Sequence, residues 1–570
     1  MHTMLAFDEE KQQRKLDELK KQEEEELLQV LAETKYGIPY INLGMTLIES
    51  EALRMITETQ ARELGIAPFK ILGKHLHVAT LSPSRDEFKT FIAGVEKKGF
   101  QPTVYLASHA SMEKAWQRYK ELSFAEQSRS GGVDISGDTL AEISSKIHNM
   151  QDIKVLLEGV VTDKTSHKTS HILEIVLAGA IGLGVSDIHI EPEEDRVRLR
   201  YRLDGVLQDI YFFSGDVEKL INSRIKLISG MKLTAKAIAQ DGRFAIFISD
   251  EEVSVRVSVI PGAFGESIVM RLLNPKSIQV KLDEMGIDQK LFAIIEKEIS
   301  KPNGLILVTG PTGSGKTTTL YAFLRRIYSD QIKIITIEDP VEYHLEGITQ
   351  TQTNSEKGYT FLEGLRAALR QDPDVIMVGE IRDDETAKIA VESALTGHIV
   401  FSTLHTNNAA GVIPRLIDLG VEAKLLPSAL SLSIAQRLLR KLCNECKQPK
   451  VLTPEEDGLL RGILKDAKDA GKNIDDYNID LTKTLGVHEA VGCKVCNFTG
   501  YKGRIGIFEA ILSDESIEKI VPSNPSEREI KRVARGQGIL DMHEDAVVKI
   551  VRGITTIEEA QSVVDLEEKI

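Results

Sequence analysis

One eight-residue segment constrains this 570-residue chain more than any other part of the sequence. The segment reads G-P-T-G-S-G-K-T over residues 310–317 and satisfies the pattern G-x-x-x-x-G-K-[S/T] in full. An apolar run at residues 305–309 precedes it, and a segment with helical character follows at 318–328. This order of strand, loop and helix is the context that a phosphate-binding loop requires. A glycine-rich turn without a chemical role would not need both flanks.

The loop predicts ATP with Mg²⁺ as its ligand. Its glycines let successive backbone N–H groups curl around phosphates, and the N-terminus of the following helix adds positive potential. Lys316 is expected to reach the β and γ phosphates, and Thr317 to offer its hydroxyl group to Mg²⁺. The predicted ATP-binding residues are Gly310, Pro311, Thr312, Gly313, Ser314, Gly315, Lys316, Thr317 and Thr318.

The residues around this loop predict the sheet that carries it. Apolar, strand-like runs alternate with helix-like segments from residue 304 to residue 404. This alternation is typical of an α/β domain with a parallel, doubly wound sheet, because parallel strands need crossover connections. The strand-like runs lie at residues 305–309, 332–337, 375–378 and 399–402.

Carboxylates follow two of these runs. One strand ends in Glu380, which a parallel sheet would place beside the phosphates, where it would hold the magnesium shell through water. Another leads into Glu338, Asp339 and Glu342. A carboxylate at that position orients and polarises the attacking water. Spacing alone does not choose among these three residues.

The four cysteines form two C-x-x-C pairs, Cys443 with Cys446 and Cys493 with Cys496, separated by 46 residues. Four thiolates in two such pairs predict a closed, tetrahedral Zn²⁺ site with a structural role. Redox-active pairs are the alternative, but the surroundings are not thioredoxin-like. Four cysteines are too few for a disulfide scaffold and fit a reducing compartment.

Composition predicts a cytosolic protein without a direct membrane span. Apolar residues make up 42% and charged residues 28% of the chain, and no run approaches the roughly 18 consecutive apolar residues of a membrane helix. The acidic start lacks the basic and apolar regions of a secretory signal. The 71 basic and 86 acidic residues give a net charge of −15, which repels phosphate backbones. We therefore expect no nucleic-acid partner.

The length predicts several domains, because the chain is several times longer than a typical domain. Residues 8–33 have apolar positions at helical spacing and fit either a solvated charged helix or a docking helix. Residues 196–207 and 253–273 alternate as half-buried strands do. The predicted parts are an N-terminal α/β domain with the leading helix at 1–122, a linker at 123–145, a smaller α/β domain at 146–283, the P-loop domain at 284–440, a four-cysteine module at 441–515 and a helical C-terminal tail at 516–570.

Three further segments complete a resemblance to a known family. T-I-E-D-P-V-E ends at Glu342, L-R-Q-D-P-D-V-I-M-V-G-E-I-R-D contains Glu380, and T-G-H-I-V-F-S-T-L-H-T-N contains His398 and His405. From about residue 186 to 509 the chain resembles the secretion ATPases of type IV pilus and type II secretion systems. The resemblance implies a RecA-like motor domain behind a PAS-like domain. It assigns the catalytic carboxylate to Glu342, the Walker B acid to Glu380, and coupling of phosphate occupancy to movement to the two histidines.

The resemblance also points to four arginines. Arg256 and Arg271 in the second domain match family positions where a guanidinium group neutralises charge that develops on the γ-phosphate. Arg366 and Arg370, four residues apart on one helical face, match another pair. Without the resemblance, the sequence pattern predicts that each of these arginines is a surface residue and that a histidine on a strand is a core residue.

The function implied by the resemblance is a hexameric ring of identical subunits that hydrolyses ATP to power pilus assembly through an inner-membrane platform protein. Retraction motors of the family lack the long N-terminal region and the four-cysteine module, so the assembly branch is favoured, with a type II secretion motor as the alternative. The N-terminal domain would dock on a cytoplasmic adaptor of the platform. The protein would then be cytoplasmic and peripherally associated with the inner face of the cell membrane. The duplicated motifs with which some relatives bind cyclic di-GMP are not found in residues 1–122.

Three other classes of function share part of this pattern. A nucleotide-gated binding module that does not turn ATP over would lack the base or the magnesium carboxylate, and candidates for both are present. A nucleic-acid translocase shares the loop and the ring, but the net charge of −15 disfavours it. A small-molecule kinase needs an acceptor pocket and a lid that the sequence does not reveal.

Overall fold

A computed structural model describes most of residues 25–567. Within that span it leaves out residues 26, 44–45, 47, 49, 54, 73–74, 98–99, 130–139, 141, 145, 163–167, 249–250, 274–279, 473 and 478. The chain divides into two compact units, Met1–Asp134 and Ile135–Ile570. Most of the predicted leading helix at 8–33 and the middle of the predicted linker at 123–145 lie outside the described residues.

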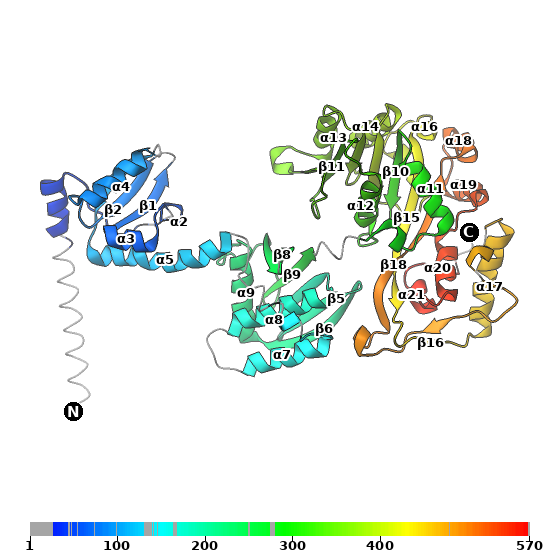
Figure 1. The fold of residues 1–570 in the computed structure, drawn as a ribbon, viewed down its shortest axis with the longest axis horizontal. Helices are drawn as coiled ribbons and strands as arrows, with labels where there is room; N and C mark the ends of the chain where they lie inside the picture. Colours follow the sequence, from blue (N-terminus) through cyan, green and yellow to red (C-terminus); the bar gives the residue numbers. More distant parts are fainter. Residues whose placement is uncertain are drawn as a thin grey trace. The chain divides into compact units, whose positions relative to one another are not determined.

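The first unit is a small three-stranded sheet with helices packed on it (Figure 1). Strand β2 lies in the centre, antiparallel to β1 and parallel to β3. The indole group of Trp116 on α5 is buried and donates a 2.9 Å hydrogen bond to the carbonyl group of Ile66 on β1. The elements are η1 (Ala32–Tyr36), α2 (Ser50–Leu53), α3 (Glu58–Leu64), β1 (Ile66–Leu72), β2 (His75–Thr80), α4 (Asp86–Lys97), β3 (Gln101–Leu106) and α5 (His109–Arg129).

The second unit begins with a six-stranded antiparallel sheet in the order β6-β5-β4-β9-β8-β7, with helices packed on it (Figure 1). Tyr201 on β5 is fully buried and donates its hydroxyl hydrogen to the carbonyl group of Val176 on α8, which fixes this helix on the sheet. The elements are α7 (Met150–Thr162), α8 (Lys168–Gly182), β4 (Asp187–Pro192), β5 (Arg196–Leu203), β6 (Val206–Ser214), α9 (Gly215–Ile228), β7 (Gln240–Ile248), β8 (Glu251–Pro261) and β9 (Glu266–Leu273).

Both alternating segments of this sheet contain a turn that the sequence pattern did not predict. Between β5 and β6, Asp204 and Gly205 adopt positive φ values of 49° and 89°. Asp-Gly is a strong signal for a two-residue hairpin turn, because both central residues of that turn need positive φ. Residues 262–265 make the corresponding turn between β8 and β9. Residues 253–273 therefore span a hairpin of β8 and β9, and residues 196–207 span β5, its turn and the start of β6.

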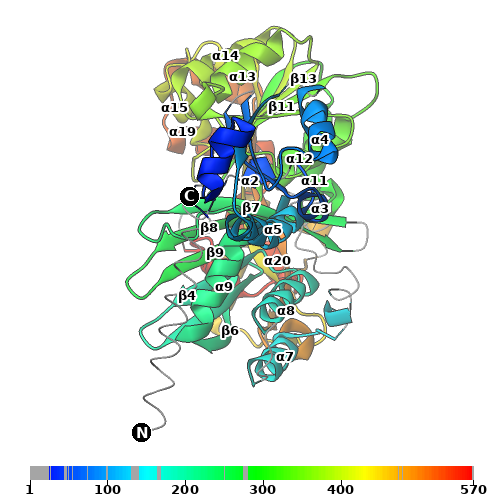
Figure 2. The ribbon, with the colours of Figure 1, turned by 90° about the vertical axis from the view of Figure 1, so that its left-hand side faces the viewer.

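The predicted parallel, doubly wound sheet is confirmed in the next part of the unit. Its strand order is β12-β11-β13-β14-β10-β15-β18, and each described pair is parallel except β15 with β18. Figure 2 shows α13 and α14 together beside β11 and β13. The strands are β10 (Gly304–Thr309), β11 (Ile334–Glu338), β12 (Thr349–Gln352), β13 (Val375–Val378), β14 (Ile399–Leu404), β15 (Leu430–Leu442) and β18 (Tyr501–Leu512).

Helices cover both faces of this sheet, so its central strands are apolar on both sides. Leu305 and Leu307 of β10 belong to one buried cluster, and Ile306 and Val308 belong to the opposite cluster. Because both faces of β10 are buried, its sequence is a continuous apolar run rather than an alternating pattern. The helices are α11 (Gln289–Ile299), α12 (Lys316–Ile327), α13 (Phe361–Leu369), α14 (Asp384–Leu395), α15 (Val412–Asp418) and α16 (Leu426–Ala429), with the short helices η2 (Leu282–Glu284) and η3 (Ser355–Lys357).

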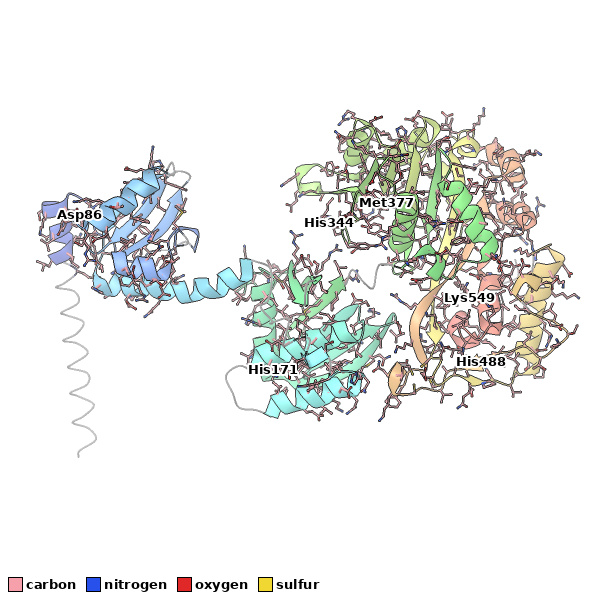
Figure 3. The ribbon with its side chains drawn as sticks, in the orientation of Figure 1. Asp86, His171, His344, Met377, His488 and Lys549 are labelled. Carbon is pink, nitrogen blue, oxygen red and sulfur yellow. The ribbon has the colours of Figure 1, made fainter. Side chains whose placement is uncertain are left out.

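The C-terminal part extends the sheet and carries the cysteines. Strand β15 continues past its pairing with β10, and it ends at Leu442, immediately before Cys443. Lys549, labelled in Figure 3, lies on α20. It forms a buried ion pair with Asp545 on the same helix. The elements are β16 (Gln448–Pro449), α17 (Pro454–Asp469), η4 (Ile474–Tyr477), β17 (His488–Glu489), η5 (Lys494–Cys496), α18 (Glu515–Ile520), η6 (Val521–Ser523), α19 (Glu527–Ala534), η7 (Arg535–Gln537), α20 (Met542–Val551) and α21 (Ile557–Gln561).

A search of the described helices found no segment with the length and apolar character needed to cross a membrane.

Candidate functional site

The phosphate-binding loop lies at the carboxyl edge of the parallel sheet, between β10 and α12. Gly315 precedes the first residue of α12 with a φ of 92°, which a residue with a side chain rarely adopts. The Lys316 ammonium group donates to the carbonyl groups of Gly310 and Pro311 at 2.9 and 3.1 Å. Burial lowers the pKa of Lys316, while the nearby charge of Glu380 opposes that shift. The loop, its lysine and this carboxylate therefore belong to one electrostatic site.

Strand register brings Glu380 and His405 to the same edge as the loop. Val378 pairs with Ser402, and Thr309 pairs with Leu404, so the residues after β10, β13 and β14 emerge together. The Nε2 atom of His405 and a carboxylate oxygen of Glu380 lie 3.1 Å apart. These two predicted site residues are thus in direct contact.

Two basic side chains hold Glu380 in its ionised form. Burial alone would raise its pKa, but hydrogen bonds from Arg382 and His405 outweigh burial and leave the pKa of Glu380 below its usual value. An ionised carboxylate beside the phosphate-binding loop is the group that a hydrated Mg²⁺ ion requires. Thr317 is the second residue of α12 and lies at the same edge of the sheet.

The three carboxylates after β11 occupy different environments. Glu338 is buried and accepts hydrogen bonds from Tyr321, Thr336 and Gln350, and burial raises its pKa. Asp339 is exposed, whereas Glu342 is half-buried at the edge of a cavity. Figure 3 labels His344 in the loop that carries Glu342. Glu338 has its oxygens occupied by internal donors, and Glu342 is the carboxylate of the three that lines the cavity.

A row of three arginines lines the same cavity from the antiparallel sheet. Arg243 on β7 pairs in register with Arg256 on β8, and Arg256 pairs with Arg271 on β9. The cavity has a volume of about 740 Å³. Arg256 lies 3.3 Å from a carboxylate oxygen of Glu342 and donates to the carbonyl group of Val341 at 3.0 Å. Carboxylates offset part of the charge of this row, because Arg271 lies 2.8 Å from Asp187 and Asp241 also lines the cavity. Three neighbouring guanidinium groups nevertheless supply several donors that can bind an anion.

Sequence reasoning found two members of this row and missed Arg243. Arg243 follows Asp241 and Gly242 at the start of β7, and no local motif marks it as functional. Its role becomes visible only through the cross-strand register with Arg256. The available signal was the short apolar run at residues 244–248, rich in aromatic and β-branched side chains, which was not recognised as a strand.

Three other predicted site residues are not brought to this edge. Arg366 lies on the exposed face of α13, 2.9 Å from Glu363 and 3.4 Å from Glu385, and Arg370 is exposed at the end of the same helix. His398 precedes β14 at the amino edge of the sheet, because Ile399 pairs with Gly304 at the start of β10. Its Nδ1 atom lies 3.0 Å from the carbonyl oxygen of Ser393.

The four cysteines form one cluster. All four sulfur atoms lie within 4.8 Å of one another, and the sulfur pairs 443–493, 446–496 and 493–496 are separated by 3.9, 3.8 and 3.8 Å. A tetrahedral ion with metal–sulfur bonds of about 2.3 Å separates its ligands by about 3.8 Å. The donor set and the spacing therefore fit a tetrahedral thiolate site for a metal ion.

The thiol groups differ in acidity. Burial opposes ionisation of Cys496, but backbone N–H groups of Cys493 and Gly500 outweigh it and lower the pKa of Cys496 to about 7. Burial raises the pKa of Cys446 to about 12. Four thiolates together need a compensating cation, since each added negative charge disfavours the next.

Comparisons with known proteins agree with this arrangement. The sequence profile described as type II/IV secretion system protein matches residues 163–562, and that of the MshEN domain matches residues 36–126. The chain is 36% identical to the type IV pilus assembly ATPase PilB of Myxococcus xanthus over 542 residues, covering 94% of this chain and 90% of that protein. It is 43% identical to the type II secretion system protein E of Pseudomonas aeruginosa over 388 residues, covering 68% of this chain and 74% of that protein.

A solved structure supports the fold. The structure of the Legionella pneumophila ATPase DotB matches 70% of this chain and 97% of its own, with 22% identity and a TM-score of 0.50. At this identity the likeness concerns the fold alone.

The cysteine cluster makes a testable prediction. We expect the purified protein to carry one tightly bound divalent metal ion per chain, and Cys446→Ser to lose most of it and unfold at a lower temperature. Asn444→Ser is the matched control, because Asn444 is exposed in the same loop and offers no sulfur ligand. Metal content by elemental analysis and thermal unfolding are the measurements. Equal metal content in wild type and Cys446→Ser would contradict the site.

Proposed function

The chain belongs to the type II/IV secretion system protein family, and on this premise we propose that it is a hexameric motor ATPase that powers assembly of a type IV pilus. The observation that carries the proposal is the meeting of Lys316, Glu380 and His405 at one edge of the parallel sheet. This edge thereby combines a lysine that would bind phosphate, a carboxylate that would bind Mg²⁺, and a histidine that contacts this carboxylate.

In the proposed reaction the nucleotide lies between the phosphate-binding loop and the arginine row. Backbone N–H groups of the loop and Lys316 bind the phosphates, and Thr317 and Glu380 hold Mg²⁺, which would neutralise phosphate charge when bound. Glu342 orients the attacking water and accepts its proton. Arg256, beside Glu342, together with Arg243 and Arg271, stabilises the charge that develops on the γ-phosphate.

The contact between His405 and Glu380 supplies a route from occupancy to movement. Glu380 would hold Mg²⁺ through the same carboxylate that contacts His405, so the segment after β14 would change position with occupancy of the site. We propose a supporting role for His398, which precedes the opposite end of β14. Arg366 and Arg370, exposed on α13, are proposed to face a neighbouring subunit of the ring.

We propose Zn²⁺ as the ion of the cysteine cluster, with a structural role. Two of its ligands directly follow β15 and two precede β18, so the ion would clamp residues 443–496 onto the motor sheet. The module proposed at 441–515 includes β18, which pairs with β15 in the sheet of the P-loop domain proposed at 284–440.

Pilus assembly is favoured over type II secretion by the extent of the alignments. The Myxococcus pilus ATPase aligns with 94% of the chain, whereas the Pseudomonas secretion protein aligns with 68%. The proposed partners are an inner-membrane platform protein and its cytoplasmic adaptor, with the N-terminal domain as the docking part. The protein would act in the cytoplasm, at the inner face of the cell membrane.

Glu342→Gln tests the catalytic assignment. We expect Mg-ATP turnover to fall about 10²- to 10⁴-fold while nucleotide affinity stays close to that of wild type, because the variant loses the base and keeps the phosphate-binding loop. Wild-type specific activity should rise with protein concentration, since ring formation completes the site. Turnover and affinity are measured side by side at several concentrations.

Glu346→Gln is the matched control, because Glu346 is an exposed carboxylate of the same loop that does not line the cavity. Full turnover in Glu342→Gln would remove this residue from the mechanism. A wild type that binds nucleotide tightly without hydrolysis would instead favour a nucleotide-gated binding module.

Deletion of the gene distinguishes the two cellular roles. A pilus-assembly motor predicts loss of surface pili with protein secretion intact. A secretion motor predicts the reverse, and electron microscopy of the cell surface together with assay of secreted proteins separates them.

A further inference from the structure

Strand β15 supports the phosphate-binding loop from behind through one buried side chain. Thr309, the last residue of β10, pairs with Ala435, so Gln436 is the first residue of β15 beyond the end of β10. The phosphate-binding loop begins at this level of the sheet. Gln436 is 0% exposed, although it is a polar residue. A buried amide of this kind needs partners for both its donor and its acceptor atoms.

Both ends of the Gln436 amide bind the loop or the helix that follows it. Its Nε2 atom donates to the carbonyl oxygen of Ser314 at 2.6 Å. Its Oε1 atom accepts the hydroxyl hydrogen of Thr319 at 2.6 Å. Thr319 lies two residues after Thr317 in the first turn of α12. One side chain thus links the loop and the start of the helix to the neighbouring strand.

The fit between Gln436 and the loop leaves no spare room. A Cβ atom at Gly315 would lie 2.8 Å from the Gln436 Nε2 atom, and one at Gly310 would lie 2.6 Å from the Gln436 carbonyl oxygen. Contacts this short are not sustained by real side chains. The glycines therefore permit the approach of β15 to the loop as well as the approach of phosphates.

Phosphate binding dictates which way the Ser314 carbonyl group points. The loop binds anions because its N–H groups point inward, so a carbonyl group that turned inward would repel the phosphates. Gly313 and Gly315 flank Ser314, have φ values of 81° and 92°, and offer little resistance to peptide rotation. The hydrogen bond from Gln436 holds the Ser314 carbonyl group on the side away from the ligand.

We propose that Gln436 is a positioning residue for ATP binding and hydrolysis. Its N–H group fixes the Ser314 carbonyl group away from the phosphates, and its oxygen fixes the turn of α12 that carries Lys316 and Thr317. This inference rests on the proposed ATPase function. It assigns a role in the reaction to a residue of β15, a strand outside the motifs that defined the site.

Gln436→Met tests the proposal, because it removes both hydrogen bonds at a similar side-chain volume. We expect kcat/KM for Mg-ATP to fall about 10- to 100-fold and the Kd for ADP to rise, since a buried carbonyl group loses its donor. Gln436→Glu keeps an acceptor for Thr319 and loses the donor to Ser314, so it should show the same loss. Thr319→Ser keeps the hydroxyl group and should behave like wild type.

Gln537→Met is the matched control for lost stability alone. The Gln537 amide likewise makes two backbone hydrogen bonds, donating to the Leu512 carbonyl group at 2.6 Å and accepting from its N–H group at 3.1 Å, at the far end of β18. We expect this variant to unfold at a lower temperature and to keep its ADP affinity. Thermal unfolding without nucleotide and fluorescence titration with ADP are measured on the full chain.

Two results would overturn the proposal. One is a Gln436→Met variant with wild-type ADP affinity and wild-type kcat/KM. The other is equal loss of ADP affinity in Gln436→Met and Gln537→Met, which would reduce the effect to general stability. These results differ from a failure of the proposed ATPase function, in which the wild type itself would neither bind nor hydrolyse Mg-ATP.

Discussion

The pairing of parallel strands is the constraint on which the candidate site depends. Because β10, β13 and β14 run in one direction and in register, the residues that follow them emerge at one edge of the sheet. The phosphate-binding loop, Glu380 and His405 come from segments up to 95 residues apart, yet they share this edge. The buried apolar faces of β10 keep the strands in place, so packing and strand pairing bring these segments to one edge, and hydrogen bonds there set the positions of the polar groups.

A second sheet contributes the complementary charge. One cross-strand row contains Arg243, Arg256 and Arg271, and like charges in such a row repel one another. Glu342, from the P-loop domain, forms an ion pair with Arg256. Such a row stores a preference for an anion, and the γ-phosphate of a bound nucleotide would satisfy it. Under the proposed function one sheet would bind the phosphates from the loop side, and the other would provide guanidinium groups. Strand β15 connects this chemistry to the cysteine cluster, since Gln436 touches the loop and the strand ends beside Cys443.

Local patterns predicted the parts of the structure that local physics determines. The phosphate-binding loop could be predicted because strand, glycines, lysine and helix follow one another directly in the sequence. The cysteine cluster could be predicted because each C-x-x-C pair places two thiol groups close together. The hairpin at Asp204 was missed because alternation continues on both sides of the turn. Sequence spacing did not choose between Glu338 and Glu342 as the catalytic carboxylate. The structure distinguishes them, because Glu338 is buried and Glu342 lines the cavity. Arg243 and Gln436 depend on pairing with distant strands, and no local pattern records such pairing.

We propose that the arginine row and the phosphate-binding loop act on one nucleotide. The most direct measurement is single-turnover hydrolysis by a variant that combines Arg243→Gln, Arg256→Gln and Arg271→Gln, together with its affinity for ADP. We expect a rate loss of about 10³-fold or more with ADP affinity preserved, because the guanidinium groups would act on charge that develops at the γ-phosphate. A folded variant that hydrolyses bound ATP at the wild-type rate would contradict it.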